Sequence, residues 1–197
     1  MVLGMMALAA LLVVSAPAYA GLTTFKVFTG TVGLSTDGWG SLDASGTISA
    51  SVPSGSTVLA AYLYASMWST FTPSGSTLGG TAVAYGPPVV NGSAPFLASA
   101  RADVTTIVKP LIDGGPGGVY NFTVTEGSSY QDGEALVVVY SNAALPTATV
   151  GILDGWASVT GDTATLGFAT PLNPIAPGFF ADMRLGIGHS FPPNRRP

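Results

Sequence analysis

Two acidic residues stand close enough in the sequence to share a reaction. Asp132 and Glu134 are two positions apart, directly before the apolar run 135–140. Alternate residues of a strand project from the same face of a sheet, so the two carboxyl groups are expected on one face. Glycoside hydrolases use two carboxyl groups about 5–9.5 Å apart, one of them with a raised pKa. One hypothesis is therefore a carbohydrate-active hydrolase using Asp132, Glu134 or Asp154, and the alternative is a polar turn that leads into a buried strand.

The same acidic, glycine-rich stretches could bind calcium, which takes about 6–8 oxygen ligands and often finds them in such loops. A D-x-[DN]-x-[DN]-G run is absent, so only composition supports this site. Asp-Gly pairs are also ordinary turn residues, which is the alternative explanation. A calcium-stabilised adhesin domain is thus a further hypothesis, with candidate ligands Asp132, Glu134, Asp154 and Asp162.

Two tryptophans stand beside turn glycines, where an indole ring can project into solvent. They are Trp39 in Asp37-Gly38-Trp39-Gly40 and Trp156 in Asp154-Gly155-Trp156. Such a ring offers an apolar face and an N–H donor, a combination suited to sugars. We therefore expect polysaccharide contact around Trp39, Asp154 and Trp156, with packing over the end of a sheet as the alternative role of both rings. Trp68 ends an apolar run and is expected in the core.

Residue types that carry other chemistries are scarce in this chain. It has no cysteine and one histidine, His189, which excludes cysteine nucleophiles, thiolate metal sites and histidine zinc sites. No G-x-S-x-G run presents a serine for a catalytic triad. We therefore expect a protein that is not an enzyme and has no catalytic residues. We also expect no cofactor, and calcium is the one ligand of this kind that stays a hypothesis.

Composition indicates a folded chain without affinity for nucleic acid. Charged residues make up 8% of the chain, against about 25% in an average domain. Hydrophobic residues reach 47% and the net charge is −4, a combination unlike that of disordered chains. The six basic residues are scattered apart from Arg195-Arg196, so no stripe could neutralise several phosphates.

The first twenty residues have the pattern of a secretory signal peptide. An apolar stretch runs to Val14, a Ser15-Ala16-Pro17 break follows, and Ala18-Tyr19-Ala20 matches an A-x-A cleavage site. The stretch is too short for a spanning helix, which needs about 20 apolar residues. We expect residues 1–20 to be removed and the protein to be exported to the periplasm, cell surface or exterior, with no membrane span afterwards.

The remaining chain reads as one all-β domain over residues 21–191. Strand-like runs alternate with Gly, Pro, Ser and Asp at spacings of about 8–12 residues, which is typical of a sandwich or barrel. We predict an antiparallel β-sandwich of jelly-roll type with one short helix near 103–112, opened by Asp103 and closed by Pro110 and the run 114–118. The expected strands lie at 24–28, 46–52, 57–68, 80–85, 119–124, 135–140, 149–153, 163–168 and 183–188.

A succession of motifs resembles a group of uncharacterised bacterial exported proteins, many of which carry a PEP-CTERM sorting tail read by exosortase. The motifs are 57–64, 101–105, 133–140 and Ile152-Leu153-Asp154-Gly155-Trp156, followed by 177–183. The resemblance implies a sandwich-like domain from a Gram-negative bacterium that makes extracellular matrix, and it carries no active-site residue. We expect a non-catalytic cell-surface or matrix protein, with extracellular polysaccharide or matrix proteins as its partners. The sorting tail is not found, so the irregular tail 192–197 suggests truncation near Pro192.

Overall fold

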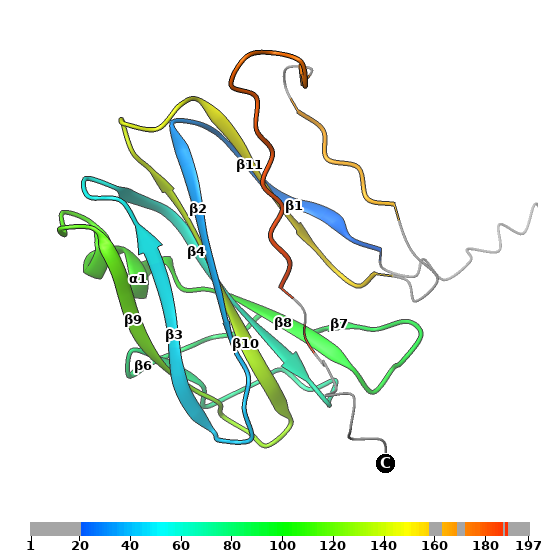
Figure 1. The fold of residues 1–197 in the computed structure, drawn as a ribbon. Helices are drawn as coiled ribbons and strands as arrows, with labels where there is room; N and C mark the ends of the chain where they lie inside the picture. The colour runs from blue at the N-terminus through cyan, green and yellow to red at the C-terminus, as the bar shows by residue number, and fades with distance from the viewer. Residues whose placement is uncertain (1–20, 158–162, 169–171, 187, 189–197) are drawn as a thin grey trace, which may run out of the picture.

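The computed structural model describes residues 21–157, 163–168, 172–186 and 188, and over these the chain is all-β apart from one short helix (Figure 1). Every strand pair is antiparallel. In chain order the elements are β1 (Thr23–Gly30), β2 (Val32–Trp39), β3 (Ser45–Val52), β4 (Thr57–Met67), β5 (Thr77–Leu78), β6 (Thr81–Ala82), β7 (Val89–Val90), β8 (Ala98–Asp103), α1 (Thr105–Ile112), β9 (Gly118–Thr125), β10 (Gln131–Ser141) and β11 (Ala148–Asp154).

A central sheet with strand order β2-β10-β4-β8-β7 carries the rest of the described structure. Its two longest strands, β4 and β10, are neighbours and have both faces covered. On the inner face Leu63 and Leu136 are completely buried, and on the outer face Tyr62 and Val139 are buried as well. A strand covered on both faces needs apolar residues at every position, which explains the nearly continuous apolar run of β4.

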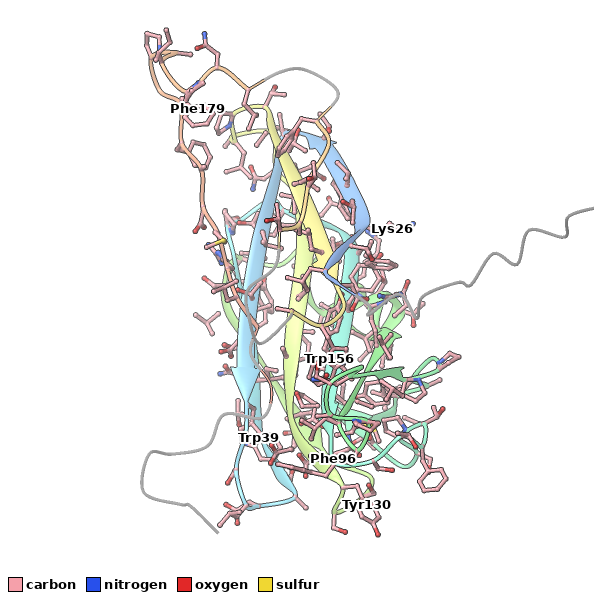
Figure 2. The ribbon with its side chains drawn as sticks, turned by 90° about the vertical axis from the view of Figure 1, so that its right-hand side faces the viewer. Lys26, Trp39, Phe96, Tyr130, Trp156 and Phe179 are labelled. Carbon is pink, nitrogen blue, oxygen red and sulfur yellow. The ribbon has the colours of Figure 1, made fainter. Side chains whose placement is uncertain are left out.

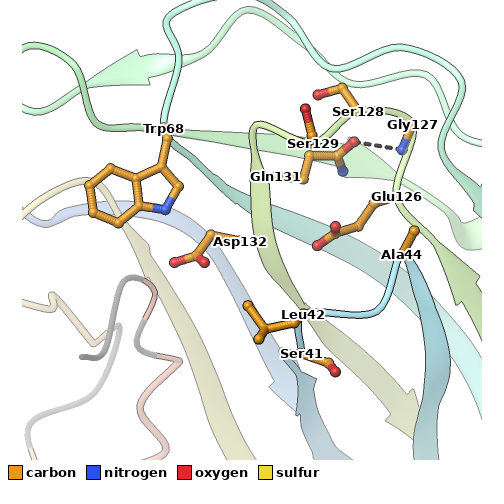
Figure 3. Close-up of a pocket in the computed structure, with 10 residues that line it drawn as sticks. All are labelled: Ser41, Leu42, Ala44, Trp68, Glu126, Gly127, Ser128, Ser129, Gln131 and Asp132. Carbon is orange, nitrogen blue, oxygen red and sulfur yellow. Dashed lines mark hydrogen bonds between the residues drawn. The ribbon is translucent and has the colours of Figure 1, made fainter. Parts of the chain in front are cut away.

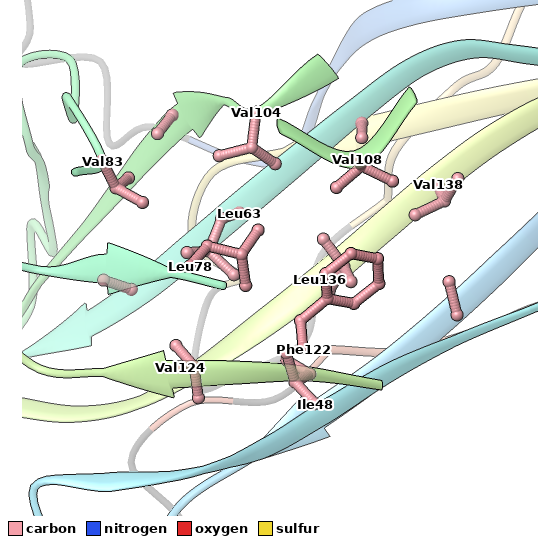
Figure 4. Packing of buried hydrophobic residues seen from close by; sticks show 14 of the residues in the cluster. Ile48, Leu63, Leu78, Val83, Val104, Val108, Phe122, Val124, Leu136 and Val138 are labelled. Carbon is pink, nitrogen blue, oxygen red and sulfur yellow. The ribbon is translucent and has the colours of Figure 1, made fainter. Parts of the chain in front are cut away.

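The inner face packs against a second sheet, of order β3-β9-β5-β6, and against α1. Ile48 and Phe122 of the second sheet meet Leu136 in the main hydrophobic core, as Figure 4 shows. The two sheets are also tied along one edge, where the Asp37 carboxylate of β2 accepts hydrogen bonds from the backbone N–H and hydroxyl of Ser49 in β3 at 2.7 and 2.6 Å. The inner layer is therefore held by apolar packing and by a polar seam.

Helix α1 lies beside β4 where the paired strand β8 has ended. The Thr105 hydroxyl accepts a hydrogen bond from the Ala61 N–H at 2.9 Å, and the Asp113 carboxylate accepts one from the Val58 N–H at 2.7 Å. Lys109 donates to the Val58 carbonyl at 2.8 Å. Side chains of the helix and of Asp113, which follows it, thus satisfy backbone groups of β4 that a further strand would otherwise pair.

The outer face of the central sheet is partly covered by the two-stranded sheet β1-β11. A smaller core forms there, in which Ile152 packs with Tyr62 and Val139, and Phe25 stands edge-on to Tyr62 with ring centroids 5.1 Å apart. The described part of the molecule therefore has three layers, with the central sheet in the middle.

The predicted sandwich is confirmed in its coarse form, as antiparallel sheets packed together with one short helix; the jelly-roll topology stays a prediction. Six expected strands lie in β1, β3, β4, β9, β10 and β11. The helix runs over Thr105–Ile112, so Pro110 lies inside it, and the helix ends just before the run 114–118. Asp103 precedes the helix and accepts a hydrogen bond from the Thr105 N–H at 2.9 Å.

Two predicted strands are wrong. Residues 163–168 and the described residues among 183–188 have no strand structure, although their residue types alternate. Leu166 packs on Gly151 of β11 without entering a strand ladder. Of 80–85, only β6 is a strand. Conversely, β2 and β8 were not expected from the sequence. A strand needs a neighbour to pair with, and the local pattern does not reveal that neighbour.

Two expected segments cannot be compared with the structure. Residues 1–20, the expected signal peptide, and the tail 192–197 lie outside the described residues. Within the described residues, no helix is both long enough and apolar enough to span a membrane.

Replacing Leu136 tests the central role of the doubly covered sheet. Leu136→Ala is expected to lower the free energy of unfolding by about 2–5 kcal/mol, because it leaves a cavity at a completely buried position. Leu111→Ala is the matched control, since Leu111 is 57% exposed on α1, and it should change stability by less than about 0.5 kcal/mol. Urea denaturation measures both, and equal losses would contradict the assignment.

Candidate functional site

An open pocket of about 450 Å³ lies at one end of the sandwich, where three connections come together (Figure 3). The β2–β3 connection, the end of β4, and the β9–β10 connection with the start of β10 supply its lining. Two backbone hydrogen bonds join these segments, from Glu126 to Ala44 at 2.9 Å and from Trp68 to Tyr130 at 2.8 Å. The described lining residues are Ser41, Leu42, Ala44, Trp68, Glu126, Gly127, Ser128, Ser129, Gln131 and Asp132.

Trp68 is the aromatic residue of this pocket, and its expected place in the core is wrong. Strand β4 ends at the buried Met67, and Trp68 follows it with a half-buried side chain. Its ring stacks on Phe96, with centroids 6.1 Å apart and planes 12° from parallel. In Figure 2, Phe96 and Tyr130 lie at the same end of the molecule as Trp39. Trp68 is thus held at the pocket by the end of a strand and by an aromatic neighbour.

Asp132 and Glu134 do not share a face, which corrects the prediction from their spacing. The register of β10 against β4 shifts between Gln131 and Glu134, as in a β-bulge. Gly133 takes a φ of +107° there, and a side chain at this position would come within 2.7 Å of the Trp39 carbonyl oxygen. The bulge leaves Asp132 exposed at the pocket and turns Glu134 into the interior, where it is 4% exposed.

The Glu134 carboxyl group lies in an environment that disfavours its charge. Its Oε1 accepts a hydrogen bond from the Gln131 amide at 2.9 Å. Among the described residues, Oε2 has no hydrogen-bond partner, and neither has the buried hydroxyl of Tyr85. Burial, with the nearby charge of Glu126, raises the pKa of Glu134 to about 8, although the Gln131 hydrogen bond acts in the opposite direction. Glu134 is therefore largely protonated at neutral pH.

Glu126 is the second carboxyl group of the pocket, and the sequence analysis missed it. Its Oε1 accepts a hydrogen bond from the Gly133 N–H at 3.0 Å, so it braces the bulge from the neighbouring connection. Burial and the charge of Asp132 raise the pKa of Glu126. The available signal was weak: an acid opening the polar run Glu126-Gly127-Ser128-Ser129 between two strands.

Gln131 links the pocket to the interior. Its amide oxygen accepts hydrogen bonds from the Gly127 N–H at 2.7 Å and from the buried Ser76 hydroxyl at 3.0 Å. Its amide nitrogen donates to Glu134. A buried hydrogen-bond network on the interior side therefore fixes the position of the β9–β10 connection. This favours a pocket that is already formed before a ligand binds.

The structure does not bring the three residues expected to contact polysaccharide onto one surface. Trp39 packs against the inner core, directly over Gly46 of β3. Asp154 forms an ion pair with Arg101 in the outer layer, and the guanidinium of Arg101 stacks on Phe25 at 3.4 Å. Trp156 donates its indole N–H to the Val89 carbonyl at 2.8 Å. Asp154 and Trp156 remain near each other, and Trp39 belongs to a different layer.

The acids expected to bind calcium are separated as well. Asp132 lies at the pocket, Glu134 in the interior and Asp154 in the outer layer, and no group of three acidic or histidine side chains in the described residues could hold a metal ion. Asp162 and His189 lie outside the described residues. Calcium binding by this set stays a prediction.

Comparison with known proteins identifies no relative. No protein-family model, curated protein or solved structure matches the chain.

The raised pKa of Glu134 predicts a pH-dependent stability. Between about pH 4.5 and 8 the folded protein keeps a proton that the unfolded chain has lost, so the free energy of unfolding falls as the pH rises. One such proton gives a slope of at most about 1.4 kcal/mol per pH unit, and Glu126 contributes with the same sign. Glu134→Gln should flatten the slope, because an amide has no proton to lose. Urea denaturation at a series of pH values measures this effect.

Asp43→Asn is the control for this experiment, since Asp43 is an exposed acid on the β2–β3 connection. It should leave the slope unchanged. A wild-type stability that is constant over the same pH range would show that Glu134 ionises normally and is not confined in the interior.

Proposed function

We propose that this protein is an exported, non-catalytic protein of the cell surface or extracellular matrix, and that it binds polysaccharide in the pocket at Trp68. The observation that carries the proposal is the lining of the pocket, where an aromatic ring stands among serine hydroxyls and carboxyl groups. The apolar face of a sugar packs on an indole ring, and its hydroxyls pair with carboxylates and serines. The volume of about 450 Å³ is in the range of small-molecule sites.

Export is supported by the sequence of residues 1–20 and by the resemblance to exported proteins of the PEP-CTERM type. Membership of that group and the jelly-roll topology are part of the proposal. A matrix protein needs a stable scaffold that presents a binding surface on loops, and the end of a cysteine-free sandwich suits this role.

A carbohydrate-active hydrolase is the second candidate, and one observation favours it. Glu126 and Asp132 line the same pocket, and the pKa of Glu126 is raised, as a general acid requires. Glu134 is too deeply buried to touch a substrate, and Asp154 lies in the outer layer. The acids that would act in a hydrolase are therefore Glu126 and Asp132.

Removing the Trp68 ring tests the binding proposal. Trp68→Ala is expected to weaken polysaccharide binding by about tenfold or more, because it removes the stacking surface. Trp156→Ala is the matched control and should bind like the wild type. Affinity electrophoresis in gels containing a neutral β-glucan, a galactomannan, an amino-sugar polymer or a polyuronate measures retention, with circular dichroism to confirm folding.

Two outcomes would contradict this assignment. Retention that is lost in Trp156→Ala and kept in Trp68→Ala would move the binding surface to the Asp154–Trp156 region. Wild-type protein that is retained by none of the four polymers would reject polysaccharide binding at the pocket.

A Glu126→Gln variant separates the binding protein from the hydrolase. In the hydrolase, release of reducing ends from a bound polymer should fall by about a hundredfold or more while retention in the gel persists. In a binding protein the wild type releases no reducing ends. Measured turnover that depends on Glu126 would replace the first candidate by the second.

A further inference from the structure

Segment 180–186 lies in no helix and in no strand ladder, and Figure 1 draws it as a coil. Within the described structure, its backbone N–H and C=O groups make no hydrogen bond. Every residue of the segment is exposed, and the side chains of Phe180, Met183 and Leu185 are 65%, 80% and 69% exposed. The backbone of this segment is therefore open to another molecule.

An exposed backbone without hydrogen bonds is what an endoprotease requires of its substrate. Such an enzyme binds several residues on each side of the cleaved bond in an extended conformation. A peptide bond inside a strand ladder or a helix becomes accessible only when that element opens, and the opening costs free energy. In segment 180–186 no ladder has to open, so cleavage here does not depend on local unfolding.

Arg184 is the basic residue of this segment. Its Nε lies 3.0 Å from Oδ2 of Asp182, and the two side chains are 41% and 56% exposed. An ion pair as exposed as this one contributes only about 0–1 kcal/mol. A protease whose specificity pocket holds a carboxylate can therefore bind the guanidinium group in place of Asp182, because the exchange replaces one ion pair by another. The bond that follows joins Arg184 to Leu185.

The other basic side chains that the structure describes belong to regular elements. Lys26 lies in the β1-β11 ladder and Arg101 in the β4-β8 ladder. Lys109 lies in α1. Among the described residues, Arg184 is thus the basic residue whose following bond is accessible without opening a helix or a strand.

This distribution favours one class of protease. Large apolar side chains are exposed in several connections, such as Leu42 at 89% and Phe71 at 78%. An enzyme that selects apolar side chains would therefore find several accessible bonds and degrade the chain. An enzyme that selects basic side chains finds one such bond in the described structure, so its action is a single, defined cut.

The chain beyond Arg184 returns to the outer face of the central sheet. A Cβ added at Gly186 would lie 3.7 Å from the Ala135 side chain of β10, and one added at Gly188 would overlap the Ser66 hydroxyl of β4. Both glycines thus lie against the two central strands. A cut after Arg184 separates them from the rest of the covalent chain.

We infer that the Arg184–Leu185 bond is a processing site for an endoprotease that cleaves after basic residues. Hydrolysis breaks the C–N bond, and water supplies a hydroxyl to the new carboxyl group of Arg184 and a hydrogen to the new amino group of Leu185. The piece that begins at Leu185 then leaves, and the outer face at Ala135 and Ser66 is uncovered. This inference goes beyond polysaccharide binding and does not depend on it.

Limited proteolysis of the full chain tests the site. The folded protein is treated with a low concentration of trypsin, and intact-mass spectrometry follows the products with time. Cleavage after Arg184 should be at least about a hundredfold faster than cleavage after Lys26 or Arg101, because those two bonds require a ladder to open. Size-exclusion chromatography should then separate residues 185–197 from the rest of the protein.

Variants separate the open backbone from the mere presence of an exposed basic side chain. Arg184→Gln should abolish the fast cut, and Lys26→Gln should leave it unchanged. A double variant, Arg184→Gln with Thr47→Arg, moves the arginine to an exposed position of β3 that is paired with β9. It should resist trypsin like Arg184→Gln alone. Melting curves confirm that each variant is folded.

Three outcomes would overturn the inference. An Arg184–Leu185 bond that is cut only after urea has unfolded the protein would show that the segment is protected. Fast cleavage of the double variant at position 47 would show that the whole chain is open and that Arg184 is not a distinct site. A piece 185–197 that stays bound after the cut would show that the outer face is not uncovered.

Discussion

The burial of both faces of the β4–β10 pair is the constraint on which the rest of this structure depends. Leu63 and Leu136 on the inner face, and Tyr62 and Val139 on the outer face, must all be removed from water. One covering layer cannot do this, so the inner sheet with α1 takes one face, and the β1-β11 sheet takes part of the other. At one end of the sandwich the β2–β3 connection, the end of β4 and the β9–β10 connection meet, and they form the pocket.

The pocket owes its chemistry to a single irregularity in that pair. Without the bulge at Gly133, Asp132 and Glu134 would project from the same face of the sheet. The two side chains would then both be exposed to solvent or both be buried. With the bulge, Asp132 is exposed to solvent, and Glu134 lies in the interior, where burial raises the pKa of its carboxyl group. Glu126 holds the bulge from the adjacent connection, so the same carboxyl group shapes the backbone and lines the site.

Local sequence patterns predicted the strands whose own residues are strongly apolar or alternate clearly. They missed the strands that form because a neighbouring strand pairs with them. β9 and β10 alternate or run apolar strongly enough to be recognised in the sequence. β2 contains Gly33, Asp37 and Gly38, which are poor strand formers, and it is a strand because β10 pairs with it along its whole length. The opposite error occurred at 163–168, where the alternation is clear but the backbone lies in no strand ladder. Glu126 was missed because a single acidic residue at the end of a strand gives no indication in the sequence of which residues lie near it in the fold.

By itself, the sequence determined the all-β class, the short helix and the absence of thiol chemistry, since these follow from residue types and short-range periodicity. It also identified acids and tryptophans as the residues of interest. Only the tertiary structure decided which of them meet: Trp68 with Glu126 and Asp132 at the pocket, Trp39 in the core, and Asp154 with Arg101 in the outer layer. The reason is that side-chain direction depends on register, and one inserted residue in a strand reverses it.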